Sequence, residues 1–148
     1  MARKYLRLVS RNVLMRGLLY NSYVKEKVTT KNAPSAVGLL SQAIVSNGFI
    51  FVAGQIHSAP DGKILEGTTE EKTHQIMRNL EAILKAAGAD LNNVVKATIY
   101  VTDIAELPKV NNVYKTYFAE PMPAREGVCV TTLPLGATVE ISVIAVKE

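Results

Sequence analysis

The run from Thr138 to Val146 near the end of the chain constrains the fold most, because both of its sides are apolar. Alternate residues of a β-strand share a face. One face therefore carries Val139, Ile141, Val143 and Ala145, and the opposite face carries Ile144 and Val146. A strand that is apolar on both faces must be covered on both. We expect helices of the same chain on one face and another subunit on the other.

The other sequence periodicities predict the order βββαβαββ. Asn47-Gly48 lies between two apolar runs and predicts a hairpin. Thr68 followed by Glu71 predicts the capping box of a helix that stops at Gly88. The predicted strands lie at 27–30, 41–45, 49–53, 93–101, around Arg125 and at 138–146, and the second helix covers 105–118. One sheet with both helices on a single face is the economical packing, which predicts an α+β domain.

The strand around Arg125 carries the first candidate site residue. Pro121 and Pro123 force an extended approach to it, because proline restricts its own φ and the residue before it. Arg125, Gly127 and Cys129 then share a face, and Gly127 leaves open space beside the arginine. A guanidinium next to such a gap is suited to gripping a small carboxylate through two parallel hydrogen bonds. The alternative is an ordinary strand arginine in a structural ion pair.

The net charge of +4 comes from the N-terminal segment. Six of the 17 basic residues precede the first acidic residue, Glu26, which leaves 11 basic against 13 acidic residues in the body. Because the body has no basic stripe with interleaved aromatics, we expect no nucleic-acid partner. No apolar run approaches the roughly 18 to 20 residues of a membrane span, so we expect no membrane. Because Cys129 is the single cysteine, the chain cannot form an intrachain disulfide, as expected of a reducing compartment. We expect Cys129 to be a buried thiol of the core.

Residues 1–25 have the composition of a mitochondrial transit peptide, with many arginines and no acid. Arg3, Arg7 and Arg11 recur at helical spacing along one side, and the other side is apolar. The alternatives are a basic disordered arm and a surface-binding amphipathic helix. We therefore expect a folded domain over residues 26–148 that works in the mitochondrial matrix.

Several stretches resemble the Rid family, the reactive intermediate deaminases, which is also called the YjgF family. They are Ser35–Ala43, Val52–Ile56, Lys85–Asp90, Val110–Asn111, Pro123–Arg125 and Val139–Ile141. They occur in the family's order, and the resemblance runs from about Thr29 to Val146. Three positions depart from the family's pattern, since Leu39-Leu40 stands for a frequent Pro-Tyr, Ala53 for Ser and Gly127 for a frequent Cys.

The resemblance implies a homotrimer with a chorismate-mutase-like arrangement, in which the sheets face the interior and the sites lie in clefts between subunits. It implies hydrolysis of reactive 2-imino acids and their enamine tautomers, 2-iminobutanoate and 2-iminopropanoate, to 2-oxo acids and ammonia. Such a hydrolase protects pyridoxal-phosphate enzymes in amino-acid metabolism. We expect no metal and no organic cofactor, and the only histidines, His57 and His74, are not at metal-binding spacing.

The resemblance also assigns site residues. Arg125 would hold the substrate carboxylate, and Glu140 would orient or activate the water. Gly54 would let the backbone approach the ligand, Asn111 would supply amide hydrogen bonds, and Gly127 would line the site. If the last two strands pair across the turn at residues 134–135, Arg125 and Glu140 share a face. The alternatives are a buried structural Glu140, a bulge at Gly54 and a local backbone cap at Asn111.

Two other function classes remain open beside the hydrolase. A trimeric module could bind a 2-oxo or amino acid without turnover, and Leu40 and Ala53 favour that alternative. A ribonuclease fits poorly with an acidic body whose two histidines are not paired in the sequence. A coupled assay with a threonine dehydratase separates the first two classes, because only an enzyme speeds the release of 2-oxobutanoate.

Overall fold

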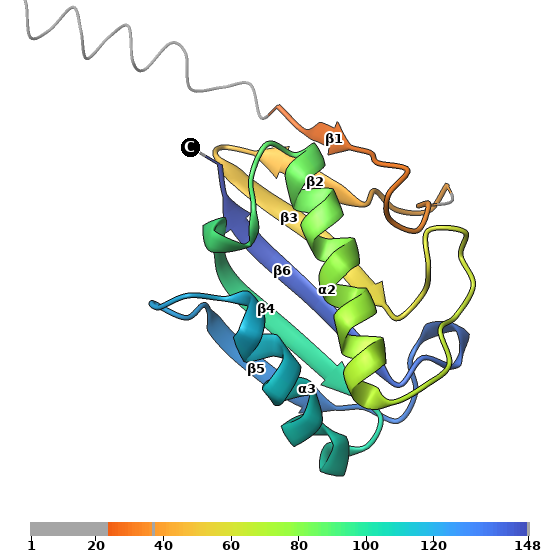
Figure 1. The fold of residues 1–148 in the computed structure, drawn as a ribbon. Helices are drawn as coiled ribbons and strands as arrows, with labels where there is room; N and C mark the ends of the chain where they lie inside the picture. Colours follow the sequence, from red (N-terminus) through yellow and green to blue (C-terminus); the bar gives the residue numbers. More distant parts are fainter. Residues whose placement is uncertain (1–23, 37, 148) are drawn as a thin grey trace, which may run out of the picture.

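The computed structural model describes residues 24–36 and 38–147, which form one six-stranded sheet and two α-helices (Figure 1). The strands are β1 Glu26–Val28, β2 Ala43–Ser46, β3 Phe49–Ile56, β4 Val94–Val101, β5 Ala124–Cys129 and β6 Val139–Val146. The helices are α2 Thr69–Ala86 and α3 Leu107–Tyr114. The predicted order βββαβαββ is confirmed. The predicted transit peptide lies almost entirely outside the described residues.

The hairpin between β2 and β3 turns at the predicted Asn47-Gly48. Both residues have positive φ, 50° and 77°, which is the backbone of the tight hairpin turn that this dipeptide favours. Ser46 and Phe49 therefore pair directly across the turn. This pairing fixes the register along the rest of the hairpin, so that Ala43 lies opposite Val52.

Helix α2 begins and ends where the sequence predicts. The Thr68 hydroxyl accepts from the Glu71 N–H, and the Glu71 carboxylate accepts from the Thr68 N–H, so the capping box is complete. At the other end Gly88 has φ +82°, and the Ala89 N–H donates to the Leu84 carbonyl. This left-handed cap needs a residue without a side chain, which explains the stop at Gly88.

The second helix is shorter than the predicted 105–118. Its α-helical part covers Leu107–Tyr114, and one turn of 3₁₀ helix flanks it on each side, at Ile104–Glu106 and Lys115–Tyr117. Such tighter turns are frequent at helix ends, where the last backbone groups lack partners four residues away. Pro108 lies in the first turn of α3, where its missing N–H leaves no bond unmade.

The sheet order is β1-β2-β3-β6-β4-β5, and this order corrects one prediction. Strand β6 does not pair with β5. It lies antiparallel between β3 and β4, and β5 pairs in parallel with the far edge of β4. The crossover from β4 to β5 runs through α3, as parallel neighbours require. Strand β5 is therefore an edge strand, and all of its residues are exposed.

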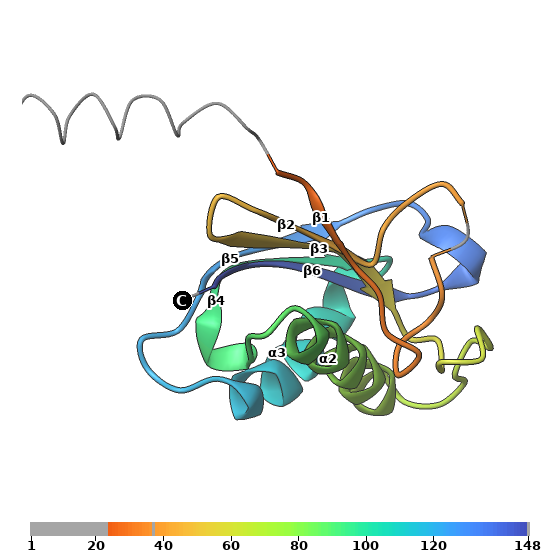
Figure 2. The ribbon, with the colours of Figure 1, turned by 90° about the horizontal axis from the view of Figure 1, so that it is seen from above.

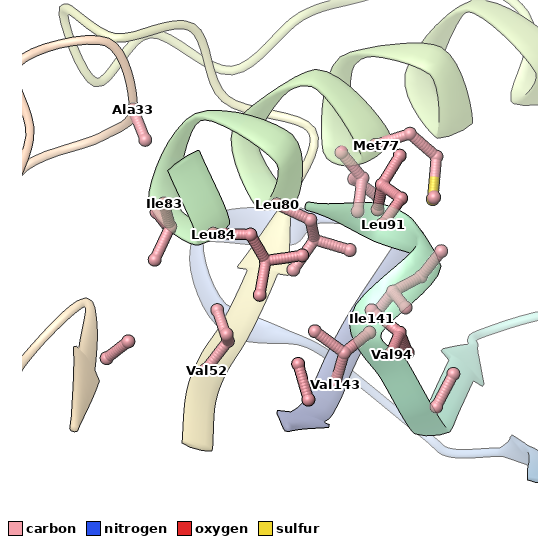
Figure 3. Packing of buried hydrophobic residues seen from close by; sticks show 14 of the residues in the cluster. Ala33, Val52, Met77, Leu80, Ile83, Leu84, Leu91, Val94, Ile141 and Val143 are labelled. Atoms are coloured by element: carbon pink, nitrogen blue, oxygen red, sulfur yellow. The ribbon is translucent and has the colours of Figure 1, made fainter. Parts of the chain in front are cut away.

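The helices cover one face of the sheet only, as predicted (Figure 2). The core lies between α2 and the sheet, where Leu80 and Leu84 pack above Val52 and Val143 (Figure 3). Along β6, buried residues face the helices, and half-buried residues point to the open face. The open face also carries Phe49 and Phe51, which are exposed. Within the described part of the chain, no helix combines the length and hydropathy needed to cross a membrane.

Candidate functional site

Arg125 lies on the helix-covered face of β5, against α3. Its register partner on β4 is Ala97, whose own partner on β6 is Val143, and both are buried under the helices. The Arg125 Nη1 donates a hydrogen bond to the Asn111 Oδ1. Its guanidinium carbon lies 5.5 Å from the centre of the Tyr114 ring. The first half of the predicted site, Arg125 with Asn111, is thus held together by α3.

The space beside Gly127 is filled, contrary to the prediction of an open gap. A Cβ placed at Gly127 would lie 3.2 Å from the Leu107 Cδ2, because Leu107 at the start of α3 covers this position. The difference arises because the helix lies directly over β5. Cys129, on the same face of the strand, is exposed, so the expectation of a buried core thiol is wrong for the single chain.

Glu140 lies on the open face of the sheet. Its register partners are Tyr100 on β4 and Ile56 on β3, and both are half-buried residues of that face. Burial of the side chain raises the pKa of the Glu140 carboxyl above its usual value, because desolvation penalises the charged form. A carboxylate with a raised pKa is a stronger base, which suits it to take a proton from water.

Gly54 faces Glu140 at an irregularity in β3. The register between β3 and β6 shifts between Val52 and Gln55, so Gly54 lies in a bulge, which was the alternative reading of this residue. A Cβ at Gly54 would lie 2.8 Å from the Glu140 Cδ and would overlap its carboxylate. The absent side chain thus makes room for Glu140.

A cleft of about 530 Å³ opens at the Glu140 carboxylate. Its walls come from four segments, namely Pro34–Ala36 with Leu40 and Gln42, Gly54–Ile56 with Ser58, Pro60–Gly62, and Pro134–Leu135. Leu135 is 75% exposed and has φ 57°, which is uncommon for a residue with a side chain. The cleft lining is largely apolar and includes two acids, Glu140 and Asp61.

Buried polar side chains fasten the walls of this cleft. Gln42, 3% exposed, accepts from the Thr30 N–H at 2.7 Å and donates to the Pro34 carbonyl at 2.8 Å. Asn79 of α2 donates to the Ser58 carbonyl at 2.9 Å. These bonds satisfy backbone groups of irregular segments that no strand or helix can satisfy, and so fix the walls.

His57 is a third buried polar side chain that bonds to backbone groups near the cleft. It is 1% exposed, its Nε2 accepts from the Thr138 N–H at 3.0 Å, and its Nδ1 lies 2.9 Å from the Leu65 carbonyl oxygen. Since that oxygen can only accept, the ring is neutral with its proton on Nδ1. Burial lowers the pKa of His57, which favours this neutral form. Thr138 leads directly into β6, so His57 fixes the approach to Glu140.

The two halves of the predicted site do not meet within one chain. Arg125 is on the helix-covered face and Glu140 on the open face. They are also two strands and three residues apart, or about 10 Å in each direction of the sheet. The expectation that they share a face is therefore wrong, because it required β5 and β6 to pair.

Tyr114 is the site residue that sequence reasoning missed. The Arg125 guanidinium lies over its ring. The available signal was its spacing from Asn111, because residues three apart on a helix share a face. A metal centre finds no support in the described residues, where no group of three His, Cys, Asp or Glu side chains is arranged to hold an ion.

Comparisons with known proteins agree on one relationship. The family model described as Endoribonuclease L-PSP matches residues 30–147. The 2-iminobutanoate/2-iminopropanoate deaminase of Rattus norvegicus is 42% identical, over 86% of this chain and 93% of the rat protein. Among solved structures, yeast Mmf1 superposes with a TM-score of 0.83 at 38% identity, covering 84% of this chain and 100% of Mmf1. E. coli TdcF with bound serine gives a TM-score of 0.79 at 32% identity, covering 84% of this chain and 100% of TdcF.

Proposed function

The chain belongs to the Endoribonuclease L-PSP family, the Rid or YjgF family, and from that premise we propose that it is a cofactor-free 2-imino acid deaminase. The reaction is hydrolysis of 2-iminobutanoate or 2-iminopropanoate to the 2-oxo acid and ammonia. The 2-iminobutanoate/2-iminopropanoate deaminase of the rat, at 42% identity, supports this reaction class. The proposal assigns Arg125 and Glu140 to the reaction and Gly54, Asn111 and Gly127 to the substrate-binding surface.

The chemistry requires little beyond positioning. A protonated imine is already electrophilic at its carbon, so the protein has to anchor the carboxylate and place a water. Glu140 takes a proton from the attacking water as the new C–O bond forms. The proton then passes to the nitrogen. As the C–N bond breaks and the C=O bond forms, the hydroxyl gives its proton to Glu140, and this proton leaves with ammonia as ammonium. The raised pKa of Glu140 supports its role as the base.

Arg125 supplies the carboxylate anchor. One N–H of the Arg125 guanidinium donates to Asn111, and the guanidinium has four further N–H donors. Two parallel N–H groups match the two oxygens of a carboxylate. Because the Arg125 side chain is exposed on an edge strand, a small substrate can reach it without any opening of the fold.

The observation that carries the proposal is the separation of Arg125 and Glu140 onto opposite faces of one sheet. The two half-sites can act on one substrate only if β5 of one chain meets the Glu140 cleft of another. Such a contact joins two different surfaces, and contacts of this kind form a ring when the rotation from one subunit to the next closes on itself. We propose that this ring is the homotrimer that the family resemblance implies, with three intersubunit sites. The exposed β5 and the exposed Phe49 and Phe51 of the open face support an interface on these surfaces.

The proposal extends to localisation. The composition of residues 1–25 supports import into mitochondria, where the enzyme would remove imines released by pyridoxal-phosphate dehydratases. A fluorescent reporter fused to residues 1–30 should collect in mitochondria. A reporter that stays in the cytosol would exclude this part of the proposal.

A coupled assay tests the activity. A threonine dehydratase supplies 2-iminobutanoate through its enamine, and the release of 2-oxobutanoate is followed with and without the protein. An enzyme accelerates release in proportion to its concentration. The non-catalytic binding module remains the second candidate, since Leu40 and Ala53 replace hydroxyl-bearing residues of the family pattern. Binding of 2-oxobutanoate without acceleration would favour that module.

A further inference from the structure

Tyr114 and Asn111 contact the same guanidinium from one side of α3. They lie three residues apart on the helix, so their side chains project in the same direction. Asn111 accepts from the Arg125 Nη1, and the Tyr114 ring lies under the guanidinium with its centre 5.5 Å from the Arg125 Cζ. The Arg125 side chain is exposed on an edge strand, so these contacts are what restrict it.

We propose that Tyr114 is a positioning residue, whose ring holds the Arg125 guanidinium in the orientation that receives the substrate carboxylate. This inference rests on the proposed deaminase function, since it assigns Arg125 to the carboxylate.

The hydrogen bond to Asn111 does not by itself fix the orientation of the Arg125 guanidinium. A bond from a single nitrogen leaves the guanidinium free to rotate about that contact. A ring face beside the cation adds an attraction between the positive charge and the negative face of the π-system. Together the two contacts fix the plane of the guanidinium. Its remaining N–H groups then keep one direction, which reduces the rotamer entropy lost when a carboxylate binds.

The ring and the hydroxyl of Tyr114 are separable in this role. Tyr114 is 3% exposed, and its hydroxyl has no hydrogen-bond partner among residues 24–36 and 38–147. A buried hydroxyl without a partner contributes no favourable bond within the chain. The ring itself is held by Phe118, whose centre lies 4.6 Å away. The ring is thus the part of Tyr114 that acts on Arg125.

Two substitutions distinguish the ring from the hydroxyl. Tyr114→Phe keeps the ring and removes the hydroxyl, so it should leave the affinity for carboxylate ligands unchanged. Tyr114→Leu keeps an apolar side chain and removes the ring. Cation–π contacts of this type correspond to about a 3- to 30-fold effect on binding, so Tyr114→Leu should weaken binding within that range.

A purely structural role of Tyr114 requires its own control. Val110→Ala removes buried volume from the same helix, at a side chain that is fully buried in the core and is not in the Arg125 contacts. This variant should lose thermal stability while keeping its affinity for the ligand. If Val110→Ala weakens binding as much as Tyr114→Leu, the loss at Tyr114 reflects packing and the proposal is overturned.

The experiment measures the Kd of 2-oxobutanoate by calorimetry and kcat and KM in the dehydratase-coupled assay, on the full chain. Tyr114→Leu should raise Kd and KM together and leave kcat within about twofold. The same substitution in an Arg125→Met background should change nothing further, since its target is gone. Equal losses in Tyr114→Phe and Tyr114→Leu, or a full additional loss in the Arg125→Met background, would overturn the role of the ring. A wild-type chain that neither binds 2-oxobutanoate nor speeds its release would overturn the proposed function, and the inference with it.

Discussion

The carboxylate of Glu140 lies directly against the backbone of Gly54, in space that any other residue at position 54 would occupy. The bulge in β3 and the acid on β6 are therefore one structural unit at the base of the cleft. The glycine is required by a neighbouring side chain of the same chain, whether or not a ligand is present.

Gly54→Ala should displace Glu140 and destabilise the protein. A Cβ would lie 2.8 Å from the Glu140 Cδ, so either the acid or the bulge must move. Overpacking of this kind costs about 1 to 3 kcal/mol, or about 2 to 12 °C in Tm for a chain of this size. Adding Glu140→Asp, which shortens the acid by one methylene, should recover part of the Tm. No recovery in the double variant would show that the strain lies elsewhere in β3.

Glu140→Gln should lower kcat and stabilise the fold at neutral pH. The folded-state pKa of Glu140 is raised, so ionisation costs stability that is present below its ordinary pKa and is lost as pH rises through the folded value. Glutamine never ionises and avoids that cost. Urea unfolding of both proteins should show the advantage of the variant at pH 7 and a smaller advantage at pH 4. A variant less stable than wild type at pH 7 would contradict the desolvation of Glu140.

His57 should make the protein sensitive to mild acid. Its folded-state pKa lies below the ordinary 6.5, so the unfolded chain binds a proton first and stability falls as pH drops from about 6.5 toward the folded value. Protonation of Nε2 also removes the acceptor of the Thr138 N–H. Lys72 and Glu66 are the charged groups near the ring, with opposite effects on its pKa. In His57→Gln, unfolding free energy measured from pH 7.5 to 5.5 should be lower but flatter, and an unchanged slope would exclude His57 as the cause.

Arg125→Lys should weaken substrate binding without unfolding the chain. Lysine keeps the charge and loses the planar fork, and a charge-assisted hydrogen bond is worth roughly 1.5 to 3 kcal/mol. We expect kcat/KM to fall about 10- to 100-fold and Arg125→Ala to fall further. Tm should change little, since the Arg125 side chain is exposed. A large drop in Tm with undiminished activity per folded protein would assign Arg125 a structural role instead.

The full chain should behave as a trimer in solution. The two proposed half-sites lie on opposite faces of the sheet, so the proposed reaction requires assembly. Light scattering should give about three times the 16.1 kDa of one chain. Glu126→Arg reverses the charge at the Lys96 ion pair on the open face of β5 and should weaken assembly. Activity of a stable monomer would contradict the intersubunit site.

The sequence predicted the elements well because their signals are local. The capping box at Thr68, the left-handed stop at Gly88 and the turn at Asn47-Gly48 each depend on residues a few positions apart. The partner of β5 depends instead on a crossover through α3, for which periodicity carries no signal. Assuming that neighbours in sequence pair led to the wrong face for Glu140 relative to Arg125.

For the candidate site, too, the sequence predicted local features better than tertiary contacts. Arg125 and Asn111 were each expected to bind the substrate. In the structure Arg125 donates a hydrogen bond to Asn111. Leu107 fills the space that the absent side chain of Gly127 was expected to leave open. Both outcomes follow from where α3 lies on the sheet, which depends on how the whole helix packs. The sequence was sufficient to choose the candidate site residues. Which of them lie next to one another depends on the tertiary packing.

The exposure of strand β5 has a consequence for any chain that has not yet joined the proposed trimer. Strand β5 is a parallel edge strand, exposed at every residue, with Val128 41% exposed on its open face. Unpaired edges of this kind offer their free backbone groups to any extended segment that approaches. A newly folded chain would thus have an aggregation-prone sheet edge until another subunit covers it. The time spent as a free monomer, more than the stability of the fold, would then limit how much soluble protein accumulates.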